Sequence, residues 1–326
     1  MRSRLLYLIC AVATAAPLLL SCRESPAPAP AASQASPTKP RVALVMKTLT
    51  SPFFVEMERG ARRAEAELGV ELLVKTAAQE TSIEQQIAII DQLTRDKVDA
   101  IVVAPGDSTR LIPGLKLAQA AGIQIVNVDN ALDAATARRE ALADVPFISV
   151  DNREAVRLAA VHLASGVREP TQAAIIEGIR GASNAEDRRR GALLAFADNP
   201  MIKVVASETA NWKIDDARDV ARQIFKAHPQ VKLLVCANDM MALGAIRYLQ
   251  EASIRGVRVS GFDALDEAVQ AMREGWMEAS VDQQAGQQGY LGVAYAVRML
   301  KGDKPPATTL LETRLVTAAS LGTVKP

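Results

Sequence analysis

Short apolar runs alternate with amphipathic stretches of helical length along almost the whole chain from Arg41 onward. The first runs are RVALVM, VELLVKTA, AIVVAP and IQIVNVD, and each is apolar along most of its length. Strands of this kind are covered on both faces, which is typical of parallel sheets flanked by helices. The stretches between them end at glycine, as in ELGV and AAGI, where helices commonly terminate. The rhythm therefore predicts an α/β fold.

The same rhythm restarts after an irregular stretch at 131–145, with the runs FISV, AAIIEGI, IKVVAS, VKLLVCA and VRVSGF. About ten such units exceed what one open doubly wound sheet usually carries, so the pattern favours two α/β domains of similar size. A chain of 326 residues with 49% apolar side chains can supply two cores of that size.

The first 22 residues are typical of an export signal, because Arg2 and Arg4 precede a nearly continuous apolar run that ends at LLSC. This ending resembles the lipobox of bacterial lipoprotein precursors. The resemblance implies that Cys22 is acylated and becomes the new N-terminus. An uncleaved membrane anchor is the alternative, although the run is at the short end for a membrane span.

Residues 23–40 are rich in Pro, Ala and Ser and show no apolar period. This composition predicts a semi-extended tether that holds a globular body away from a membrane. We therefore expect a lipid-anchored protein of the cell envelope, facing the periplasm or the cell exterior, with its function in 41–326.

Only one cysteine is expected to stay free in the folded body. Cleavage of the signal would remove Cys10, and the lipid would block Cys22. Cys236 remains, within the apolar run LLVCA, and is predicted to be a buried and inert thiol. No intramolecular disulfide is then possible.

Motifs of covalent, metal-assisted and nucleotide chemistry are absent from the sequence. It contains no GxSxG, GxxxxGK[ST], GxGxxG, CxxC, HxH or HExxH, and both histidines, His162 and His228, lie in helical stretches. The 38 basic and 37 acidic residues leave a net charge of +1, which provides no bulk positive field for nucleic acids. We predict no catalytic residue, no cofactor, no metal and no nucleic-acid partner.

Polar and aromatic residues follow nearly every predicted strand, at the edge of a parallel sheet where ligands bind. An isolated Asp there is usually a helix N-cap, and that alternative applies to each of them. The segments concerned are 47–54, 105–108, 129–130, 151–152, 178–188, 211–212, 238–239, Asp263 and 282–283.

The side chains at these strand ends suit a neutral polyol. Sugar hydroxyls both donate and accept, so they pair well with carboxylates and amides, and apolar C–H patches of a sugar pack on flat rings. Phe53 and Phe54 lie at such a turn in one half of the chain, and Trp212 lies at one in the other. We expect these rings to clamp a sugar from opposite sides.

Seven ordered segments from about Arg41 to the end resemble the periplasmic sugar-binding proteins of ABC importers, particularly those for D-ribose and D-allose. The segments are KTLTSPFF (47–54), VNVDN (126–130), IIEGIRGASNAEDRRRG (175–191), ETANW (208–212), CANDMMALGA (236–245), SGFDA (260–264) and ASVDQQ (279–284).

The resemblance implies the type I periplasmic binding protein fold, in which two doubly wound parallel-sheet lobes are joined by a hinge of three crossings. We expect the first lobe to comprise 41–145 plus about 285–314, and the second 146–284 plus about 315–326. The crossings are expected near 144–147, near 283–286 and around 313–317.

The family's ligand contacts can be transferred to matching positions of this sequence. Phe53, Phe54 and Trp212 match aromatic contacts, and Arg188 matches an arginine that bridges two hydroxyls. Lys47 resembles the allose type, whereas Asn130 departs from the arginine of ribose binders and the glutamate of allose binders. Ser51 stands where relatives often have Asn. The full implied set is Lys47, Ser51, Phe53, Phe54, Asp129, Asn130, Arg188, Trp212, Asn238, Asp263 and Gln283.

By this resemblance, the chain is expected to be the monomeric, lipid-anchored binding component of an ABC sugar importer that closes on a monosaccharide. It would deliver that sugar to a membrane permease and its ATPase. An exported receptor that feeds a chemoreceptor or sensor kinase is the main alternative. A sugar-responsive repressor would need a DNA-reading domain where the export signal lies, and a sugar-modifying enzyme would need an acid/base or nucleophile pair.

Overall fold

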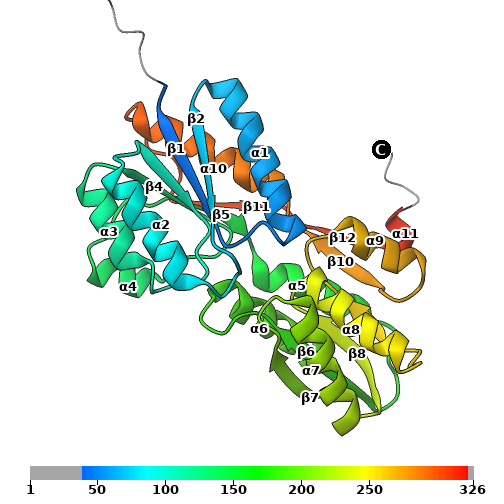
Figure 1. Ribbon diagram of the computed structural model, residues 1–326. Coiled ribbons are helices and arrows are strands. Elements are labelled where there is room, and N and C mark those ends of the chain that lie inside the picture. Colours follow the sequence, from blue (N-terminus) through cyan, green and yellow to red (C-terminus); the bar gives the residue numbers. More distant parts are fainter. Residues whose placement is uncertain (1–38, 322–326) are drawn as a thin grey trace, which may run out of the picture. The chain divides into compact units, whose positions relative to one another are not determined.

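The computed structural model describes residues 39–321, and every structural statement below refers to that range. The predicted signal segment, the acylation site Cys22 and most of the predicted tether lie outside it. The described chain folds around two separate six-stranded sheets (Figure 1). The two-lobed α/β fold predicted from the sequence is therefore confirmed.

The first sheet has the strand order β11-β5-β4-β3-β1-β2, and every pairing between neighbouring strands is parallel. Its strands are β1 (Arg41–Met46), β2 (Glu71–Thr76), β3 (Ala100–Val103), β4 (Gln124–Val128), β5 (Phe147–Val150) and β11 (Thr308–Leu311).

The second sheet has the corresponding order β12-β10-β9-β8-β6-β7. Its strands are β6 (Thr171–Glu177), β7 (Ile202–Thr209), β8 (Val231–Cys236), β9 (Arg258–Ser260), β10 (Ala279–Asp282) and β12 (Arg314–Thr317). All pairings are parallel except that of β10 with the edge strand β12.

Helices cover both faces of the first sheet. Leu44 points into a core shared with two of them, whereas its neighbour Val45 points into the core on the opposite face, as expected for a strand. The helices on the Leu44 side are α1 (Pro52–Leu68) and α10 (Ala285–Leu300), and those on the Val45 side are α2 (Ile83–Arg95) and α3 (Ile112–Ala120); the short α4 (Ala134–Arg139) follows β4.

The second sheet is covered in the same way. Ile175 and Ile176 of β6 are buried in cores on opposite faces. The helices on the Ile175 side are α5 (Asn152–Ala164) and α6 (Ser183–Ala197), and those on the Ile176 side are α7 (Ile214–Ala227), α8 (Asp239–Glu251) and α9 (Asp266–Arg273); the short α11 (Ala318–Leu321) follows β12.

The chain passes between the lobes three times, and the first crossing differs from the sequence expectation. The predicted boundary at 144–147 is too early, because β5 pairs with β4 and β11 in the first sheet. The chain therefore crosses only after Val150, just before α5 begins at Asn152. The other two crossings lie at 283–284 and at 312–313.

The antiparallel edge strand β12 follows from the third crossing. Strand β11 runs parallel to β5 and ends near the lobe boundary, and the chain enters the second sheet only two residues later (Figure 1). A strand that enters from this side must run against the neighbouring strands, which end there. The predicted parallel-sheet lobes are thus confirmed, and the second sheet carries one antiparallel strand at its edge.

Three helix pairs pack so closely that only glycine fits at the contact. A Cβ atom on Gly60 of α1 would overlap the carbonyl oxygen of Gly286 of α10. Likewise, Gly191 of α6 lies against the backbone of Arg153 in α5, and Gly244 of α8 lies against that of Ile214 in α7. Each lobe thus depends on backbone-to-backbone contact between its covering helices.

We expect Gly60→Ala to lower the free energy of unfolding by about 1–3 kcal/mol, because the added methyl forces the two helix backbones apart. Gly114→Ala is the matched control, since a Cβ added to this helical glycine of α3 would lie 3.5 Å from its nearest neighbour, an ordinary van der Waals distance. Better helix propensity should make that variant equal to the parent or more stable, by up to about 1 kcal/mol. Urea denaturation followed by circular dichroism measures both. Equal destabilisation of the two variants would contradict the packing argument.

Candidate functional site

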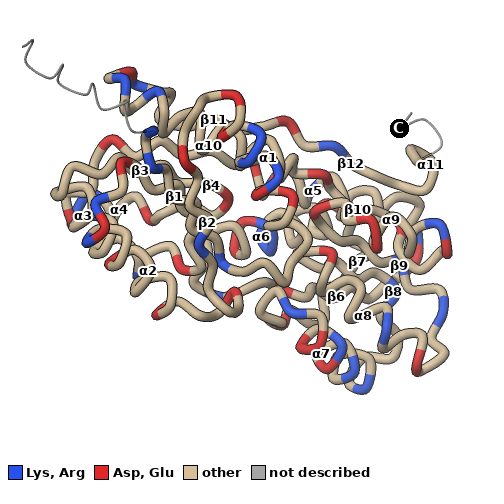
Figure 2. The backbone as a smooth tube through the Cα atoms, turned by 45° about the horizontal axis from the view of Figure 1, so that its top comes forward, with Lys and Arg blue, Asp and Glu red and all other residues tan. Residues whose placement is uncertain are grey.

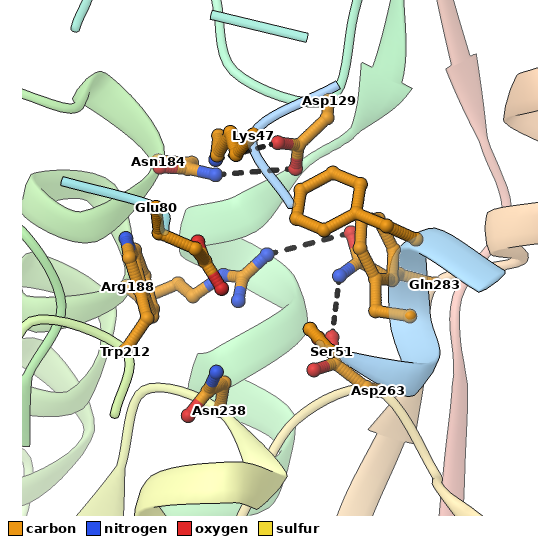
Figure 3. Close-up of a pocket in the computed structure, with 12 residues that line it drawn as sticks. Lys47, Ser51, Glu80, Asp129, Asn184, Arg188, Trp212, Asn238, Asp263 and Gln283 are labelled. Carbon is orange, nitrogen blue, oxygen red and sulfur yellow. Dashed lines mark hydrogen bonds and ion pairs between the residues drawn. The ribbon is translucent and has the colours of Figure 1, made fainter. Parts of the chain in front are cut away.

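A pocket of about 270 Å³ lies between the two lobes, at the carboxyl ends of strands from both sheets (Figure 3). Its lining residues are Lys47, Ser51, Phe53, Phe54, Glu80, Asp129, Asn184, Arg188, Trp212, Asn238, Asp263 and Gln283. This set contains every side chain that the sequence predicted to contact a ligand, with the exception of Asn130. The sequence alone did not single out Glu80 and Asn184.

Lys47 and Asp129 form a buried ion pair at the wall of the first lobe. They follow β1 and β4, and the ammonium Nζ lies 2.8 Å from the carboxylate Oδ2, with both side chains 3% exposed. Asp129 has φ of 64°, a left-handed conformation that Asp tolerates better than most residues. The second carboxylate oxygen, Oδ1, accepts from Asn184 Nδ2 of the other lobe at 3.3 Å. The pair thus presents two opposite charges, held in place, to the pocket.

Arg188 enters the pocket from α6 and is tied to three parts of the structure. Its Nε donates to Asn152 Oδ1 at 2.8 Å, its Nη1 to the carbonyl of Ala237 at 2.9 Å, and its Nη2 to Gln283 Oε1 at 3.4 Å. The guanidinium also stacks on Phe262, 3.7 Å from the ring centroid. Burial lowers the pKa of Arg188, although the surrounding carboxylates act to raise it. These contacts hold the planar fork in one orientation.

Asp263, Gln283 and Asn238 supply carboxylate and amide groups on the side of the second lobe. Gln283 Nε2 donates to Asp263 Oδ1 at 2.6 Å, which links the second crossing to the loop after β9. Asn238 caps α8, because its Oδ1 accepts from the Met241 amide at 2.9 Å. The N-cap alternative is therefore correct for Asn238, whose side chain nevertheless lines the pocket (Figure 3).

The three predicted rings reach the pocket from the cores of the two lobes. Phe53 and Phe54 pack edge to face with centroids 4.9 Å apart, and both belong to the core under α1 and α10. Trp212 belongs to the core of the second lobe, where a Cβ on Gly178 would overlap its ring. Lys47 Nζ lies 5.6 Å from the Phe54 centroid and 6.0 Å from a Trp212 ring centroid, so rings of both lobes approach one point.

Apart from the Asp129 oxygen that pairs with Lys47, two polar atoms at the pocket are buried without a hydrogen-bond partner in the described chain. They are Asn184 Oδ1, an acceptor, and Trp212 Nε1, a donor. Buried polar groups are normally paired, so an orphaned donor and acceptor in one small pocket indicate a missing polar ligand or water. The ligand that fits would both donate and accept hydrogen bonds.

Asn130 is fully buried and takes part in contacts between the lobes. Its Oδ1 accepts from Ser183 Oγ at 2.9 Å and from the Asn184 amide at 3.1 Å, both in the second lobe. It does not line the pocket. The family resemblance implies a ligand contact for Asn130, but the structure places its side chain against α6.

Glu80 and Asn184 could have been found from the sequence only in part. Glu80 lies four residues beyond the end of β2, which is followed directly by two alanines and so gives no polar signal at the strand end. Asn184 lies in the strand-end segment 178–188, but only Arg188 of that segment matches a family contact. Neither position stands out by spacing or residue type alone.

The pocket contains two cationic side chains, Lys47 and Arg188, and three acidic ones, Glu80, Asp129 and Asp263. Burial raises the pKa of Glu80 from 4.5 to about 7, although Lys47 acts to lower it. Burial likewise raises the pKa of Asp263 well above its ordinary range. Protonation of one carboxyl would balance the charges, so the pocket suits an uncharged ligand.

We expect titration of Glu80 to lower the free energy of unfolding as pH rises from about 4.5 to about 7. The folded state keeps the Glu80 proton to a higher pH than the unfolded state, so it binds more protons within this window. Glu80→Gln removes the effect, and its urea midpoint should fall less than that of the parent over the same interval. Parallel pH profiles for the two proteins would contradict this assignment.

Within residues 39–321, no group of three or more His, Cys, Asp or Glu residues is arranged to hold a metal ion, and no helix is long and apolar enough to span a bilayer. Cys236 is buried and free, as predicted, and burial raises the pKa of its thiol. Basic and acidic residues are interspersed along both lobes (Figure 2).

Comparison with known proteins gives consistent results over most of the chain. The family model for the periplasmic binding protein domain matches residues 42–304. The D-ribose/D-allose-binding protein of Pseudomonas aeruginosa is 36% identical over 294 residues, which cover 89% of this chain and 91% of that protein. The D-allose-binding periplasmic protein of Escherichia coli is 31% identical over 283 residues, which cover 84% and 91%.

A solved structure agrees with the fold. The crystal structure of an ABC transporter periplasmic solute binding protein from Actinobacillus succinogenes with bound D-allose has a TM-score of 0.82 and 34% identity. The match covers 88% of this chain and 100% of that one.

Proposed function

Because the chain belongs to the periplasmic binding protein family, whose model covers residues 42–304, we propose that it binds one neutral monosaccharide between its two lobes. The observation that carries this proposal is the pocket itself. Rings, carboxylates and amides from both lobes line one small space, and two of the lining residues, Asn184 and Trp212, each carry a buried polar atom without a hydrogen-bond partner. A sugar offers apolar faces that pack on the rings and hydroxyls that pair with the polar groups.

The fixed geometry of the pocket supports the recognition of one particular sugar, because charged and amide side chains of both lobes line it. The ion pair of Lys47 and Asp129 and the cluster around Arg188 leave acceptors and donors at fixed positions. A missing or epimeric hydroxyl would leave one of them unpaired, at a cost of about 1–3 kcal/mol.

The names of the relatives make D-allose and D-ribose the first candidates. Both sugars occur in the name of the Pseudomonas relative, and D-allose is bound in the Actinobacillus structure. Lys47 matches the lysine of the allose type, and the structure pairs it with Asp129, whose carboxylate is suited to accept a sugar hydroxyl. We therefore place D-allose first, followed by D-ribose and ketohexoses.

Binding would be coupled to closure of the lobes about the three crossings. Contacts from a single ligand to both lobes stabilise the closed form relative to open forms, because only the closed form makes all of them. Gln283 lies at the second crossing and bonds to Arg188 and Asp263, so the pocket is directly connected to the hinge. Closure requires no chemical step, and we assign no catalytic residue.

The family indicates a periplasmic location, and we propose that the closed protein delivers its sugar to an ABC permease and ATPase. In this proposal the protein is a monomer, and a lipid on Cys22 keeps it at a membrane while residues 23–40 give it reach. The alternative partner is a chemoreceptor or sensor kinase. Genes for a transport ATPase and permease beside this one would favour the importer.

Sugar binding is tested most directly with the chain from residue 39 onward, which forms one compact unit. The panel for thermal-shift screening contains D-allose, D-ribose, ketohexoses and other pentoses and hexoses. We expect a few related sugars of this panel to raise the melting temperature of the protein. Isothermal titration calorimetry then gives their affinities and a stoichiometry of one. Failure of every neutral monosaccharide to bind would overturn the proposal.

Sugar binding should also change the fluorescence of Trp212. This indole lines the pocket with an unpaired Nε1, whereas the chain's other tryptophan, Trp276, stacks on Arg255 3.5 Å from its ring centroid. We expect Trp212→Phe to remove the ligand-dependent signal and weaken binding, and Trp276→Phe to leave both intact. A signal that is lost with Trp276 instead would place the ligand elsewhere.

A further inference from the structure

The N-terminus of α6 has no cap of its own. Its N-cap residue is Ala182, and no side-chain hydrogen bond caps the helix from within its own segment. The first amides of a helix have no partner inside the helix, so they need acceptors from elsewhere. This helix carries Asn184 and Arg188, which both line the pocket.

The missing cap is supplied by the other lobe. The Ser183 amide donates to Ser108 Oγ at 3.0 Å, and the Asn184 amide donates to Asn130 Oδ1 at 3.1 Å. Ser108 and Asn130 belong to the loops after β3 and β4 of the first lobe. Two side chains of the first lobe therefore cap the N-terminus of a helix in the second lobe.

The hydrogen-bonding capacity of Asn130 is fully used in this arrangement. Its two N–H groups donate to the Pro105 carbonyl at 3.1 Å and to Ser108 Oγ at 3.3 Å. Its Oδ1 accepts from the Asn184 amide and from Ser183 Oγ. An amide side chain offers two donors and two acceptor lone pairs, so none is left for a sugar hydroxyl.

A backbone contact strengthens the same interface. The Ser108 amide donates to the Gly181 carbonyl at 3.1 Å, just before α6 begins. Gly181 has φ of +108°, a value that side chains rarely allow, and a Cβ there would lie 3.1 Å from Asp107 Oδ2. The close approach of the two lobes at this point therefore depends on glycine.

We propose that Asn130 and Ser108 are positioning residues that cap α6 across the lobe boundary and so stabilise the closed form without touching the sugar. The cap forms only when the lobes meet, because its donors and acceptors lie on different lobes. It also fixes the start of the helix that presents Asn184 and Arg188. The consequence for sugar affinity rests on the proposed function, whereas the effect on closure does not.

The first test measures closure without any sugar. Cysteines are introduced at two exposed positions, Ala120 of the first lobe and Gln223 of the second, and carry spin labels. Double electron–electron resonance spectroscopy then measures the distance between the labels, which reports the separation of the lobes. The native Cys236 is buried and should not compete for the label. We expect Asn130→Ala to shift the ligand-free distribution toward open forms. Asn130→Asp, which keeps the acceptor for the α6 amides, should restore part of the closed population.

The second test uses D-allose and D-ribose as probes. Asn130→Ala should lower the affinity for every sugar that binds by the same factor, about tenfold or about 1.4 kcal/mol, chiefly through faster dissociation. A residue that touched the ligand would instead give a loss that depends on the hydroxyl configuration of the sugar.

Ser108→Ala keeps the proposal testable if Asn130→Ala fails to fold, because it removes only one hydroxyl group. We expect this variant to shift the lobes toward open forms and to lower the affinity for every sugar equally, with both effects smaller than in Asn130→Ala. Unchanged lobe distances in the folded variants, or a loss confined to one sugar, would overturn the proposal. If no sugar binds the parent protein, the proposed function fails while the lobe distances still decide whether the cap stabilises closure.

Discussion

Asp129→Asn is expected to destabilise the protein by about 3–5 kcal/mol and to abolish detectable sugar binding. The substitution keeps the shape of the side chain and suits the left-handed backbone at φ of 64°. It removes the negative charge, however, and so leaves the Lys47 ammonium without its counter-ion. The Lys47 side chain is only 3% exposed, so water cannot take the place of the counter-ion. Breaking one partner of a buried pair is costly because the remaining charge stays out of water. Urea unfolding and calorimetry measure the two effects.

The matched control for Asp129→Asn is Asp187→Asn on α6. Asp187 pairs with Arg153 at 2.9 Å at the surface, where an ion pair contributes about 0–1 kcal/mol. Stability and sugar binding should both remain close to those of the parent protein.

The double variant Lys47→Met with Asp129→Asn separates stability from recognition. It should regain most of the lost stability, because an unpaired charge no longer has to be buried. Sugar binding should not return, since the hydroxyl-accepting carboxylate is still missing. If Asp129→Asn alone proves as stable as the parent, the ion pair does not have the buried character assigned to it.

Arg188→Lys is expected to weaken sugar binding by at least about 100-fold. Lysine retains the charge but cannot reproduce the planar fork that bonds to Asn152, the Ala237 carbonyl and Gln283 at once. A charge-assisted hydrogen bond contributes about 1.5–3 kcal/mol, so the loss of two to a sugar would account for a reduction of this size. Calorimetry with D-allose and D-ribose measures the effect.

Arg189→Lys is the matched control on the same helix. Arg189 pairs with Glu186 at the surface, 2.9 Å away, and does not line the pocket. Its replacement should leave affinity within about twofold of the parent, because exposed ion pairs contribute little. Equal losses in the two variants would indicate damage to α6 as a whole, and no loss in Arg188→Lys would remove it from the site.

Topology explains why so much of the site could be predicted. Carboxyl ends of parallel strands meet at one edge of a sheet, so Lys47, Asp129 and Asp263 could be grouped from strand-end positions alone. The rings Phe53, Phe54 and Trp212 could be added because each follows such an end. The fold class followed from the same alternation of apolar runs and amphipathic helices.

Side-chain direction in the loops could not be predicted from the sequence. Asn130 follows Asp129, but the left-handed backbone at Asp129 turns the chain, and the two neighbours serve different contacts. The predicted boundary of the first lobe at 144–147 is too early for a related reason. The run FISV could belong to either sheet, and only its pairing with β4 and β11 assigns it to the first.

Both sheets are completed by the last part of the chain, and this imposes an order on folding during synthesis. The first sheet needs α10 to cover one face and β11 to protect the edge of β5, although its other strands are made before residue 151. A nascent chain halted near residue 280 would expose an apolar sheet face and an unpaired strand edge, both of which promote aggregation. The first lobe therefore cannot cover its core or pair its sheet edge until almost the whole polypeptide has been synthesised.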